Sequence, residues 1–200
     1  LLKSDINWQD RESELKDLCD KFRRKDGSYD CLVPGSGGKD SFMTAHLLKY
    51  KYGMNPLTCT WAPHIYTDWG WKNHQAWIHA GFDNILFTPN GLVHRLLTRV
   101  AMERLFHPFQ PFMIGQKNLA PKLAYLYDIS LIFYGENEAE YGNKKQNINS
   151  SVRSKDFFTG ESSSDIYLGG VSLSELEELS LTKVDFEPYM PIHPDKISEK

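Results

Sequence analysis

The chain has 200 residues, which allow one α/β domain with a sizeable core but leave too little for a second full domain. Apolar residues make up 40% of it and the formal net charge is −3 at pH 7, so it lacks the basic surface of a general nucleic-acid-binding protein. No apolar run approaches the ~20 residues that span a bilayer, and no signal peptide is visible. The three cysteines have neither metal-ligand spacing nor an even count, so we expect a cytoplasmic protein with reduced thiols.

The first helix is predicted over residues 8–25, where apolar side chains recur on one helical face. Asn7 is placed to cap this helix, and residues 25–28 form a turn after it. This segment predicts packing and no chemistry.

The most informative stretch follows this turn. The apolar run Cys31–Val33 predicts a buried strand, which Pro34 and Gly35 end. Residues 36–41 read Ser-Gly-Gly-Lys-Asp-Ser and lead into a helix predicted over 42–52. A strand, a glycine-rich turn and a helix N-terminus make an anion site, because glycines let the backbone approach a ligand and the first helical N–H groups are partly positive.

Polar side chains in the turn add to this anion site. Ser36 and Ser41 offer hydroxyl groups, Lys39 supplies a cation, and Asp40 is placed to hold Mg²⁺. The spacing is not that of the Walker P-loop, which has four residues between its glycine and Gly-Lys-Ser/Thr. The alternative is a glycine-rich turn that binds no ligand.

The next unit is a strand predicted over 57–61, a loop over 62–68 and a helix over 69–80. Ligands bind beyond the carboxyl ends of the strands in an open parallel sheet. We therefore expect the 62–68 loop to lie beside residues 36–41.

Residues around this second loop are candidates for ligand contacts. Thr60 and Trp61 either flank an adenine or simply belong to the core. His64 is a candidate substrate contact. A zinc site is not expected, because His74 and His79 are five residues apart and do not share a helical face.

A third strand is predicted over 84–88 and a helix over 92–106. Residues 107–118 contain two prolines and a glycine within an aromatic-rich run, and we expect an irregular loop there, before a short helix. We interpret this loop as one that delivers Gln116, Lys117 or Asn118 to the site. The alternative is a structural connector.

The last predicted strand, over 128–134, runs into Gly135 and a series of acidic residues. Glu136 and Glu140 would place carboxylates at the carboxyl edge of the sheet, where a nucleotide-bound Mg²⁺ needs oxygen ligands. Asn137 is a candidate substrate contact. The alternative is a solvated acidic turn.

The alternation of strand and helix over residues 30–135 predicts an α/β fold, an open parallel sheet with helices on both faces. We place a nucleotide-binding domain at 1–143, with its helix and turn at 1–29 and its core at 30–143. Residues 144–200 are expected to form a mobile loop, a short helix capped by Ser172 or Ser174 and an extended tail, facing a substrate or partner. We expect the sequence to be a fragment of a longer chain.

Residues 36–41 carry every fixed position of the SGGxDS loop, and the chain resembles the PP-loop ATP pyrophosphatases, which include amide-forming ligases and tRNA-modifying thiolases. The resemblance implies a HUP-like (adenine nucleotide alpha hydrolase-like), Rossmann-like fold that uses ATP and Mg²⁺ and cleaves between the α- and β-phosphates. Lys39 and Asp40 are then the catalytic residues. The predicted nucleotide contacts are Pro34, Gly35, Ser36, Gly37, Gly38, Lys39, Asp40, Ser41, Thr60, Trp61 and Gly135. The predicted metal ligands are Asp40, Glu136 and Glu140, and the predicted substrate contacts are His64, Gln116, Lys117 and Asn137.

Within this superfamily the chain is similar to the N-acetyl sugar amidotransferases of bacterial surface-polysaccharide (O-antigen and nonulosonic acid) biosynthesis. The similarity lies in residues 25–31, 36–41, 52–57, 111–116, 135–138 and 167–170. It implies ATP-dependent conversion of an acetamido group on a nucleotide-linked sugar into an acetamidino group, with ammonia from a separate glutaminase subunit. Family members also tend to carry a cysteine-rich, zinc-binding N-terminal segment and a further C-terminal portion, and this sequence includes neither, as we expect of a fragment.

Sulfur transfer is a less favoured alternative, because thiolase relatives commonly carry a cysteine pair where this chain has Phe-Met-Ile-Gly at 112–115. Two alternatives stay open. One is a PP-loop tRNA thiolase or another adenylating ligase, and the other is a non-catalytic nucleotide-binding module. No membrane partner is expected, and a nucleic-acid partner is not favoured.

Overall fold

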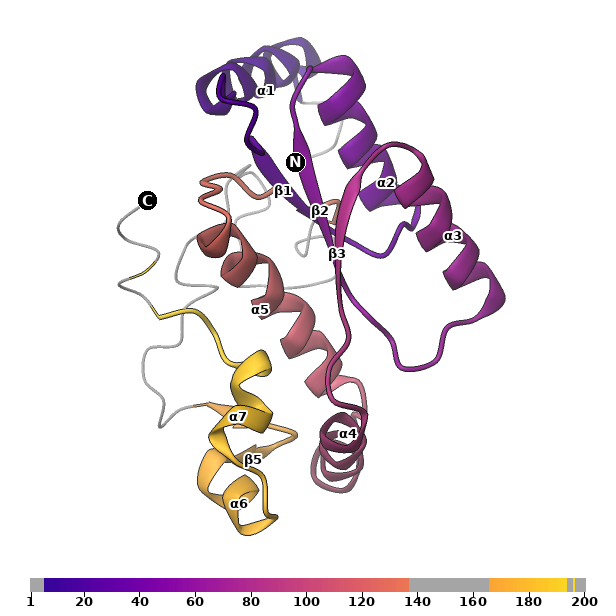
Figure 1. The fold of residues 1–200 in the computed structure, drawn as a ribbon, viewed down its shortest axis with the longest axis vertical. Helices are drawn as coiled ribbons and strands as arrows, with labels where there is room; N and C mark the ends of the chain where they lie inside the picture. Colours follow the sequence, from indigo (N-terminus) through magenta and orange to yellow (C-terminus); the bar gives the residue numbers. More distant parts are fainter. Residues whose placement is uncertain (1–5, 137–165, 194–195, 197–200) are drawn as a thin grey trace.

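A computed structural model describes residues 6–136, 166–193 and 196 of the chain (Figure 1). Its central sheet is parallel, with the strands in the order β1-β2-β3. These strands are β1 (Cys31–Pro34), β2 (Pro56–Trp61) and β3 (Asp83–Phe87). Because β1 leads into β2 and β2 into β3 through helices, the carboxyl ends of all three strands meet at one edge of the sheet.

The predicted last strand is present only as a short extended segment beside β1. The Leu32 amide donates to the carbonyl oxygen of Leu131 at 2.9 Å, and the Phe133 amide donates to the Leu32 carbonyl oxygen at 2.9 Å. Ile132 forms a single parallel bridge with Leu32. The segment therefore lies where the sequence predicted a strand, but its pairing is much shorter than residues 128–134.

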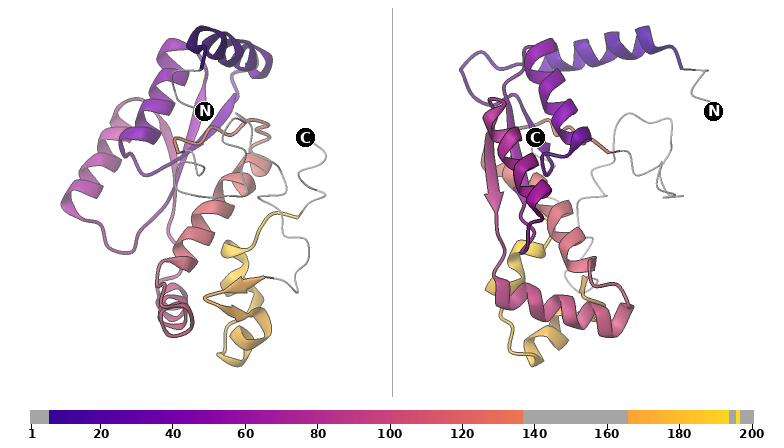
Figure 2. Two further views of the ribbon diagram at one scale, coloured as in Figure 1. Left: turned by 180° about the vertical axis from the view of Figure 1, so that it is seen from behind. Right: turned by 90° about the vertical axis from the view of Figure 1, so that its right-hand side faces the viewer.

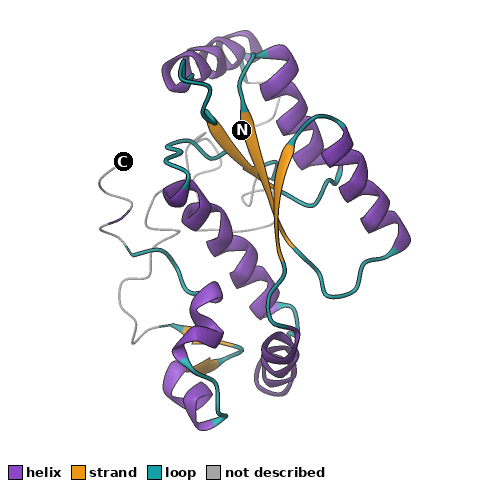
Figure 3. Ribbon diagram, in the orientation of Figure 1, coloured by secondary structure: helices purple, strands orange, loops and turns teal. Residues whose placement is uncertain are grey.

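Helices cover both faces of the sheet (Figures 1 and 2). On one face lie α1 (Trp8–Phe22), α2 (Lys39–His46), the π-helical turn η2 (Leu47–Lys51) and α3 (Asp68–His79). On the other lie α4 (Gly91–Leu105) and α5 (Gln110–Leu126). The remaining elements are β4 (Tyr167–Leu168), β5 (Val171–Ser172), α6 (Leu173–Glu178), α7 (Lys183–Phe186) and η6 (Glu187–Tyr189) (Figure 3).

Successive side chains of β1 face two different hydrophobic cores, one on each side of the sheet. Cys31 and Val33 face the core shared with α1, α2 and α3, whereas Leu32 faces the core shared with α4 and α5. This is the pattern of a strand buried on both faces, because successive side chains point to opposite sides. The predicted α/β class, a parallel sheet with helices on both faces, is confirmed.

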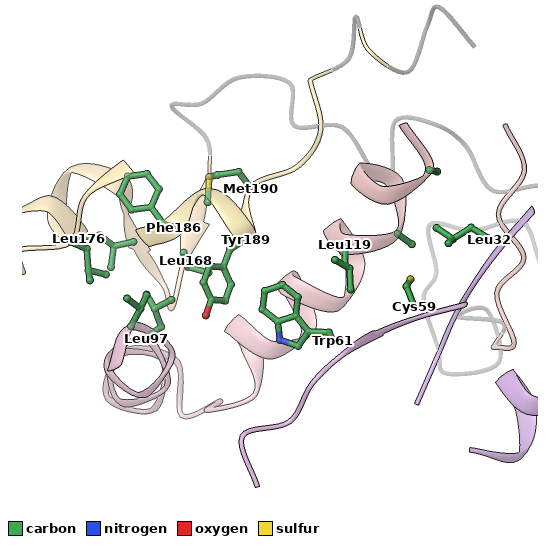
Figure 4. Close-up of a cluster of buried hydrophobic side chains, with 14 of the residues drawn as sticks. Leu32, Cys59, Trp61, Leu97, Leu119, Leu168, Leu176, Phe186, Tyr189 and Met190 are labelled. Carbon is green, nitrogen blue, oxygen red and sulfur yellow. The ribbon is translucent and has the colours of Figure 1, made fainter. Parts of the chain in front are cut away.

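The larger core joins the sheet to the C-terminal elements. Figure 4 shows Trp61 of β2 lying between Leu119 of α5 and Tyr189. Phe186 and Met190 pack into the same cluster and are buried. Residues 166–193 thus share a core with residues of the predicted nucleotide-binding domain. Across the described residues, no helix combines the length and the apolar character needed to cross a membrane.

The prediction of an irregular loop at residues 107–118 is wrong, because residues 110–118 belong to helix α5. Pro111 falls in the first turn of the helix, where its missing N–H group is not needed. Gly115 serves close packing, since a Cβ there would lie 2.3 Å from the Trp61 ring. Neither residue interrupts the helix, although both read as breakers in the sequence.

The predicted extended tail is helical in part, because residues 183–189 form α7 and η6 before the chain becomes extended at Met190. Pro188 lies in the 3₁₀ turn η6, directly after α7. Thr182 and Asp185 form a capping box that starts α7, and Tyr189 is 1% exposed. The earlier helix is confirmed, because Ser172 caps α6 as expected.

Candidate functional site

The predicted phosphate loop lies at the carboxyl edge of the sheet, between β1 and α2. The helix begins at Lys39, three residues earlier than predicted, with Gly38 as its N-cap residue. Within the described chain no side chain caps this end, so the first N–H groups of α2 have no side-chain acceptor. Together with the positive end of the helix dipole, they form a site suited to phosphate.

The glycines of this site are required by close backbone packing. A Cβ at Gly35 would lie 2.2 Å from the Cβ of Ser41, inside the loop itself. Gly37 has φ +81°, and a Cβ there would lie 2.6 Å from the carbonyl oxygen of Asn73 in α3. Only glycine fits both this conformation and this contact. The backbone of the loop is therefore packed closely against α3 at Gly37.

Gly135, at the start of the acidic segment, packs against the first turn of α2. A Cβ at Gly135 would lie 2.8 Å from the Ser41 amide nitrogen and 2.9 Å from the carbonyl carbon of Asp40. The chain after the short extended segment thus runs directly over the first turn of α2. The exposed residue Glu136 follows at once, so the structure brings predicted nucleotide residues from two distant segments together.

The charged side chains of the loop are exposed and only loosely paired. Lys39 Nζ lies 3.3 Å from Asp40 Oδ1, with the two side chains 91% and 48% exposed. Such a surface pair holds its partners weakly, so both groups are available to a ligand. Ser41 instead donates its hydroxyl group to the Gly38 carbonyl oxygen at 3.2 Å, and Ser36 is exposed.

A shallow hollow of about 520 Å³ opens beside this loop, between α2 and α3. It is lined by Gly37, Lys39, Phe42, Met43, His46 and Asn73. Asn73 contributes to it although sequence reasoning gave this residue no role. No short motif marks Asn73, which is recognised only from its contact with Gly37.

The residues present fit ATP and Mg²⁺ in part. The uncapped helix end and the glycine contacts suit a pyrophosphate group, and Asp40 and Glu136 supply two carboxylates for a metal. Among the described residues no group of three or more His, Cys, Asp and Glu converges on one point. Asn137 and Glu140 lie outside the described residues, so their assignments stay predictions.

Thr60 and Trp61 lie in the core rather than at the surface. The Trp61 ring is 4% exposed and lies 4.9 Å from Phe87 and 5.2 Å from Tyr189, between ring centroids. Thr60 is buried and accepts from Asn84 Nδ2 at 3.2 Å. Of the two alternatives considered for these residues, the structure shows the core position. Contact with an adenine stays a prediction.

Gln116 and Lys117 lie on α5, on the opposite face of the sheet from α2. The loop that was expected to deliver them to the site does not exist. Their role as substrate contacts stays a prediction without that support.

His64 is exposed on the loop after β2, and its ring centroid lies 4.6 Å from that of His94 in α4. His94 is buried, and its Nδ1 lies 2.8 Å from Tyr189 Oη. Burial, with a smaller contribution from His64, lowers the pKa of His94 to about 4, so its imidazole is neutral at pH 7. Sequence reasoning gave His94 no role, because a histidine on a helical face has no signal of its own.

Comparison with known proteins leaves the family open, since no family model matches the chain. An uncharacterized protein from Methanocaldococcus jannaschii is 35% identical over 57 residues, which cover 28% of this chain and 21% of that protein. The NH₃-dependent NAD synthetase from Campylobacter jejuni, solved with nitrate, has a TM-score of 0.49 at 11% identity, covering 97% of this chain and 92% of that one. Neither match assigns the chain to a family, so any functional conclusion depends on the site itself.

Proposed function

We propose that this chain is an ATP-dependent amidotransferase of the PP-loop type, which adenylates an acetamido group and lets ammonia displace AMP. The observation that carries this proposal is the geometry of residues 36–41. Their backbone is packed through Gly35 and Gly37, the N-terminus of α2 is free of side-chain caps, and Lys39 is 91% exposed beside it. This arrangement suits a leaving pyrophosphate, which carries several negative charges.

The reaction proceeds in two displacements. The acetamido oxygen attacks the α-phosphorus of ATP, and the bond to pyrophosphate breaks with its electron pair leaving on pyrophosphate. Loss of the amide proton gives an O-adenylated imidate. Ammonia then adds to the imidate carbon, and AMP leaves with the C–O electron pair, which produces the acetamidino group.

The chain's own residues position and neutralise charge in this scheme, and they form no covalent intermediate. The first N–H groups of α2 and the Lys39 ammonium would bind the leaving pyrophosphate and stabilise its developing charge. Asp40 and Glu136 would hold Mg²⁺, which supplies further charge neutralisation when bound. Glu140 is proposed as a third ligand.

The cysteines favour nitrogen over sulfur as the incoming atom. All three thiols of the chain are buried. Burial raises the pKa of Cys59 to about 12 and also raises the pKa values of Cys19 and Cys31. Sulfur transfer needs an accessible thiolate, and these thiols are protonated and enclosed. This supports the amidotransferase over a thiolase.

The substrate and partners come from the family resemblance and are part of the proposal. We propose a nucleotide-linked acetamido sugar of surface-polysaccharide biosynthesis as the acceptor and a separate glutaminase subunit as the ammonia source. A cytoplasmic location suits both ATP and nucleotide-linked sugars.

The test is pyrophosphate release by the purified protein with ATP, Mg²⁺, ammonium and UDP-N-acetylglucosamine. We expect pyrophosphate and AMP only in the complete mixture. Lys39→Ala and Asp40→Ala should each lower the rate at least ~100-fold, equivalent to about 3 kcal/mol of transition-state stabilisation. Lys16→Ala, on the exposed face of α1, is the matched control and should leave the rate unchanged.

Three results would separate the alternatives. Release of ADP and phosphate would contradict the proposal. Tight ATP binding without turnover on any acetamido sugar would indicate a nucleotide-binding module. Sulfur incorporation into tRNA would indicate a thiolase.

A further inference from the structure

A cluster of aromatic side chains at the start of α3 contains two buried polar atoms without hydrogen-bond partners. Tyr66 Oη and His74 Nδ1 are both enclosed, and neither has a partner among the described residues. The His74 ring centroid lies 6.2 Å from that of Tyr66 and 5.9 Å from that of Trp71, and His74 is 1% exposed. Buried polar atoms are nearly always paired in folded proteins, so two in one cluster call for an explanation.

This cluster directly adjoins the phosphate loop. A Cβ at Gly37 would lie 2.6 Å from the Asn73 carbonyl oxygen and 3.1 Å from the Cα of His74. The backbone that carries the His74 ring is therefore in contact with the loop proposed to hold pyrophosphate. A group bound at Tyr66 and His74 would lie next to the nucleotide site.

The outer side of the cluster is an exposed apolar surface. Ile65 is 88% exposed, Trp69 is 72% exposed and Trp71 is 47% exposed. Trp71 and Tyr66 form an edge-to-face pair, with ring centroids 5.4 Å apart. Exposed aromatic and aliphatic side chains next to polar groups are typical of a site for a ligand that is part apolar and part polar.

The two polar groups are uncharged at neutral pH. Burial raises the pKa of Tyr66 and lowers the pKa of His74, so the phenol stays protonated and the imidazole stays neutral. The pair thus offers one hydroxyl donor and one nitrogen that accepts or donates according to its tautomer. A secondary amide has the matching set, with a carbonyl acceptor and an N–H donor, and the methyl group of an acetamide suits the aromatic faces.

We propose that Tyr66, Trp71 and His74 form the subsite for the acetamido group of the acceptor, with Tyr66 Oη donating to its carbonyl oxygen and His74 Nδ1 accepting from its N–H. This inference rests on the proposed function and names the residues that select the substrate. Trp71 turns outward to admit the group and then covers its methyl, since an exposed side chain changes rotamer readily. None of these residues forms a covalent bond to the substrate; Tyr66 and His74 hold the acetamido group by hydrogen bonds and so determine specificity.

The experiment compares two probes that differ only in the acetamido group, UDP-N-acetylglucosamine and UDP-glucose, with UDP alone as a third arm. Binding is followed by calorimetry and by tryptophan fluorescence, with and without α,β-methylene-ATP. We expect the acetamido probe to bind at least tenfold more tightly than the other two. Its fluorescence change should vanish in Trp71→Phe and persist in Trp8→Phe, a control at the start of helix α1 whose side chain is also exposed.

Tyr66→Phe and His74→Phe remove the unpaired polar atoms and keep an aromatic ring. Each variant should bind the acetamido probe at least tenfold more weakly, bind α,β-methylene-ATP normally and unfold at an equal or higher denaturant midpoint. Equal affinity for UDP-N-acetylglucosamine and UDP alone would overturn the proposal, as would unchanged affinity in Tyr66→Phe. A marked loss of stability in Tyr66→Phe would also overturn it, because the hydroxyl group would then have a structural partner.

The two hypotheses fail separately in this design. Failure of α,β-methylene-ATP to bind would contradict the proposed function, while the probe comparison without nucleotide would still decide the subsite. Normal nucleotide binding without discrimination between the sugar probes would contradict the subsite alone.

Discussion

The protein buries two histidines, and their surroundings differ. His94 lies among α4, Tyr189 and α5, where its Nδ1 contacts Tyr189 Oη at 2.8 Å and the Tyr189 carbonyl oxygen accepts from Asn118 Nδ2 at 2.6 Å. His74 lies beside the phosphate loop, and its Nδ1 has no partner in the described part of the chain. Polar groups that stabilise a fold are paired, whereas unpaired ones cost stability and are retained where a ligand uses them. Of these two histidines, the one on the α4–α5 side thus stabilises the fold, and the one on the α2–α3 side is left for binding. An unpaired buried atom alone does not distinguish the two sides, since Trp61 Nε1 in the α4–α5 core also lacks a partner among the described residues.

The largest expected effect comes from Gly37→Ala on the binding side. An alanine Cβ would have to lie 2.6 Å from the Asn73 carbonyl oxygen, at a φ of +81°. The loop must move away from α3, and we expect pyrophosphate release to fall at least ~100-fold, or about 3 kcal/mol. The assay is steady-state release of pyrophosphate.

Gly27→Ala is the control for this substitution. Gly27 has φ +83° but nothing within 4 Å of the position of a Cβ. Both alanines cost about 1–2 kcal/mol of backbone strain, so only the displacement of the loop differs between them. Equal activities of the two variants would show that the contact with Asn73 does not matter.

The next largest effect is a loss of folding stability when the pair of His94 and Tyr189 on the α4–α5 side is broken. Tyr189→Phe keeps the ring that stacks on His94 but leaves His94 Nδ1 buried without its partner. We expect the free energy of unfolding to fall by about 1–3 kcal/mol, measured by urea denaturation. Tyr66→Phe removes a hydroxyl group of the same type and should cost nothing, so similar losses in both variants would refute the contrast between the two sides.

Acid should destabilise the protein through the same histidine. The folded-state pKa of His94 is about 4, below its ordinary value of 6.5, so the unfolded chain binds more protons. Stability is then fully present above pH 6.5 and is lost as the pH falls toward 4, by up to about 3 kcal/mol. Burial lowers the pKa of His74 as well, which adds to the loss in the same direction.

Denaturant unfolding between pH 7.5 and 4.5 measures this dependence. In His94→Gln the loss of stability over that range should be clearly smaller than in the unmodified protein. An unchanged pH dependence in this variant would show that His94 is not the group responsible.

The smallest expected effect is the change in the free energy of unfolding when Lys39 is replaced by alanine. Its ion pair with Asp40 is exposed, so Lys39→Ala should change the free energy of unfolding by less than about 0.5 kcal/mol. The same variant should lose nearly all pyrophosphate release. A large loss of stability would instead give Lys39 a structural role.

The sequence predicted the parts of the protein that local patterns specify. The buried run at Cys31–Val33, the cap at Asn7 and the glycine-rich turn into α2 all carry local signals, and the structure has each of them. The α5 helix was missed because Pro111 and Gly115 resemble breakers, and their compatibility with a helix depends on position and on the Trp61 ring.

Contacts between distant segments were beyond local patterns. The resemblance to PP-loop proteins placed Gly135 at the same site as Ser41, but nothing in the sequence shows that Gly37 touches Asn73. The pairing of His94 with Tyr189 joins residues that are 95 positions apart. The phosphate loop and Gly135 were therefore predictable from the motif and the resemblance, whereas the contacts of Asn73 and His94 were not.

The most direct test of the central claim is ³¹P NMR of ATP incubated with the protein, Mg²⁺, ammonium and UDP-N-acetylglucosamine. The loop at residues 36–41 predicts signals of AMP and pyrophosphate that grow together at equal rates and that are lost in Lys39→Ala. Signals of ADP and inorganic phosphate, or AMP production that continues unchanged in Lys39→Ala, would contradict the claim.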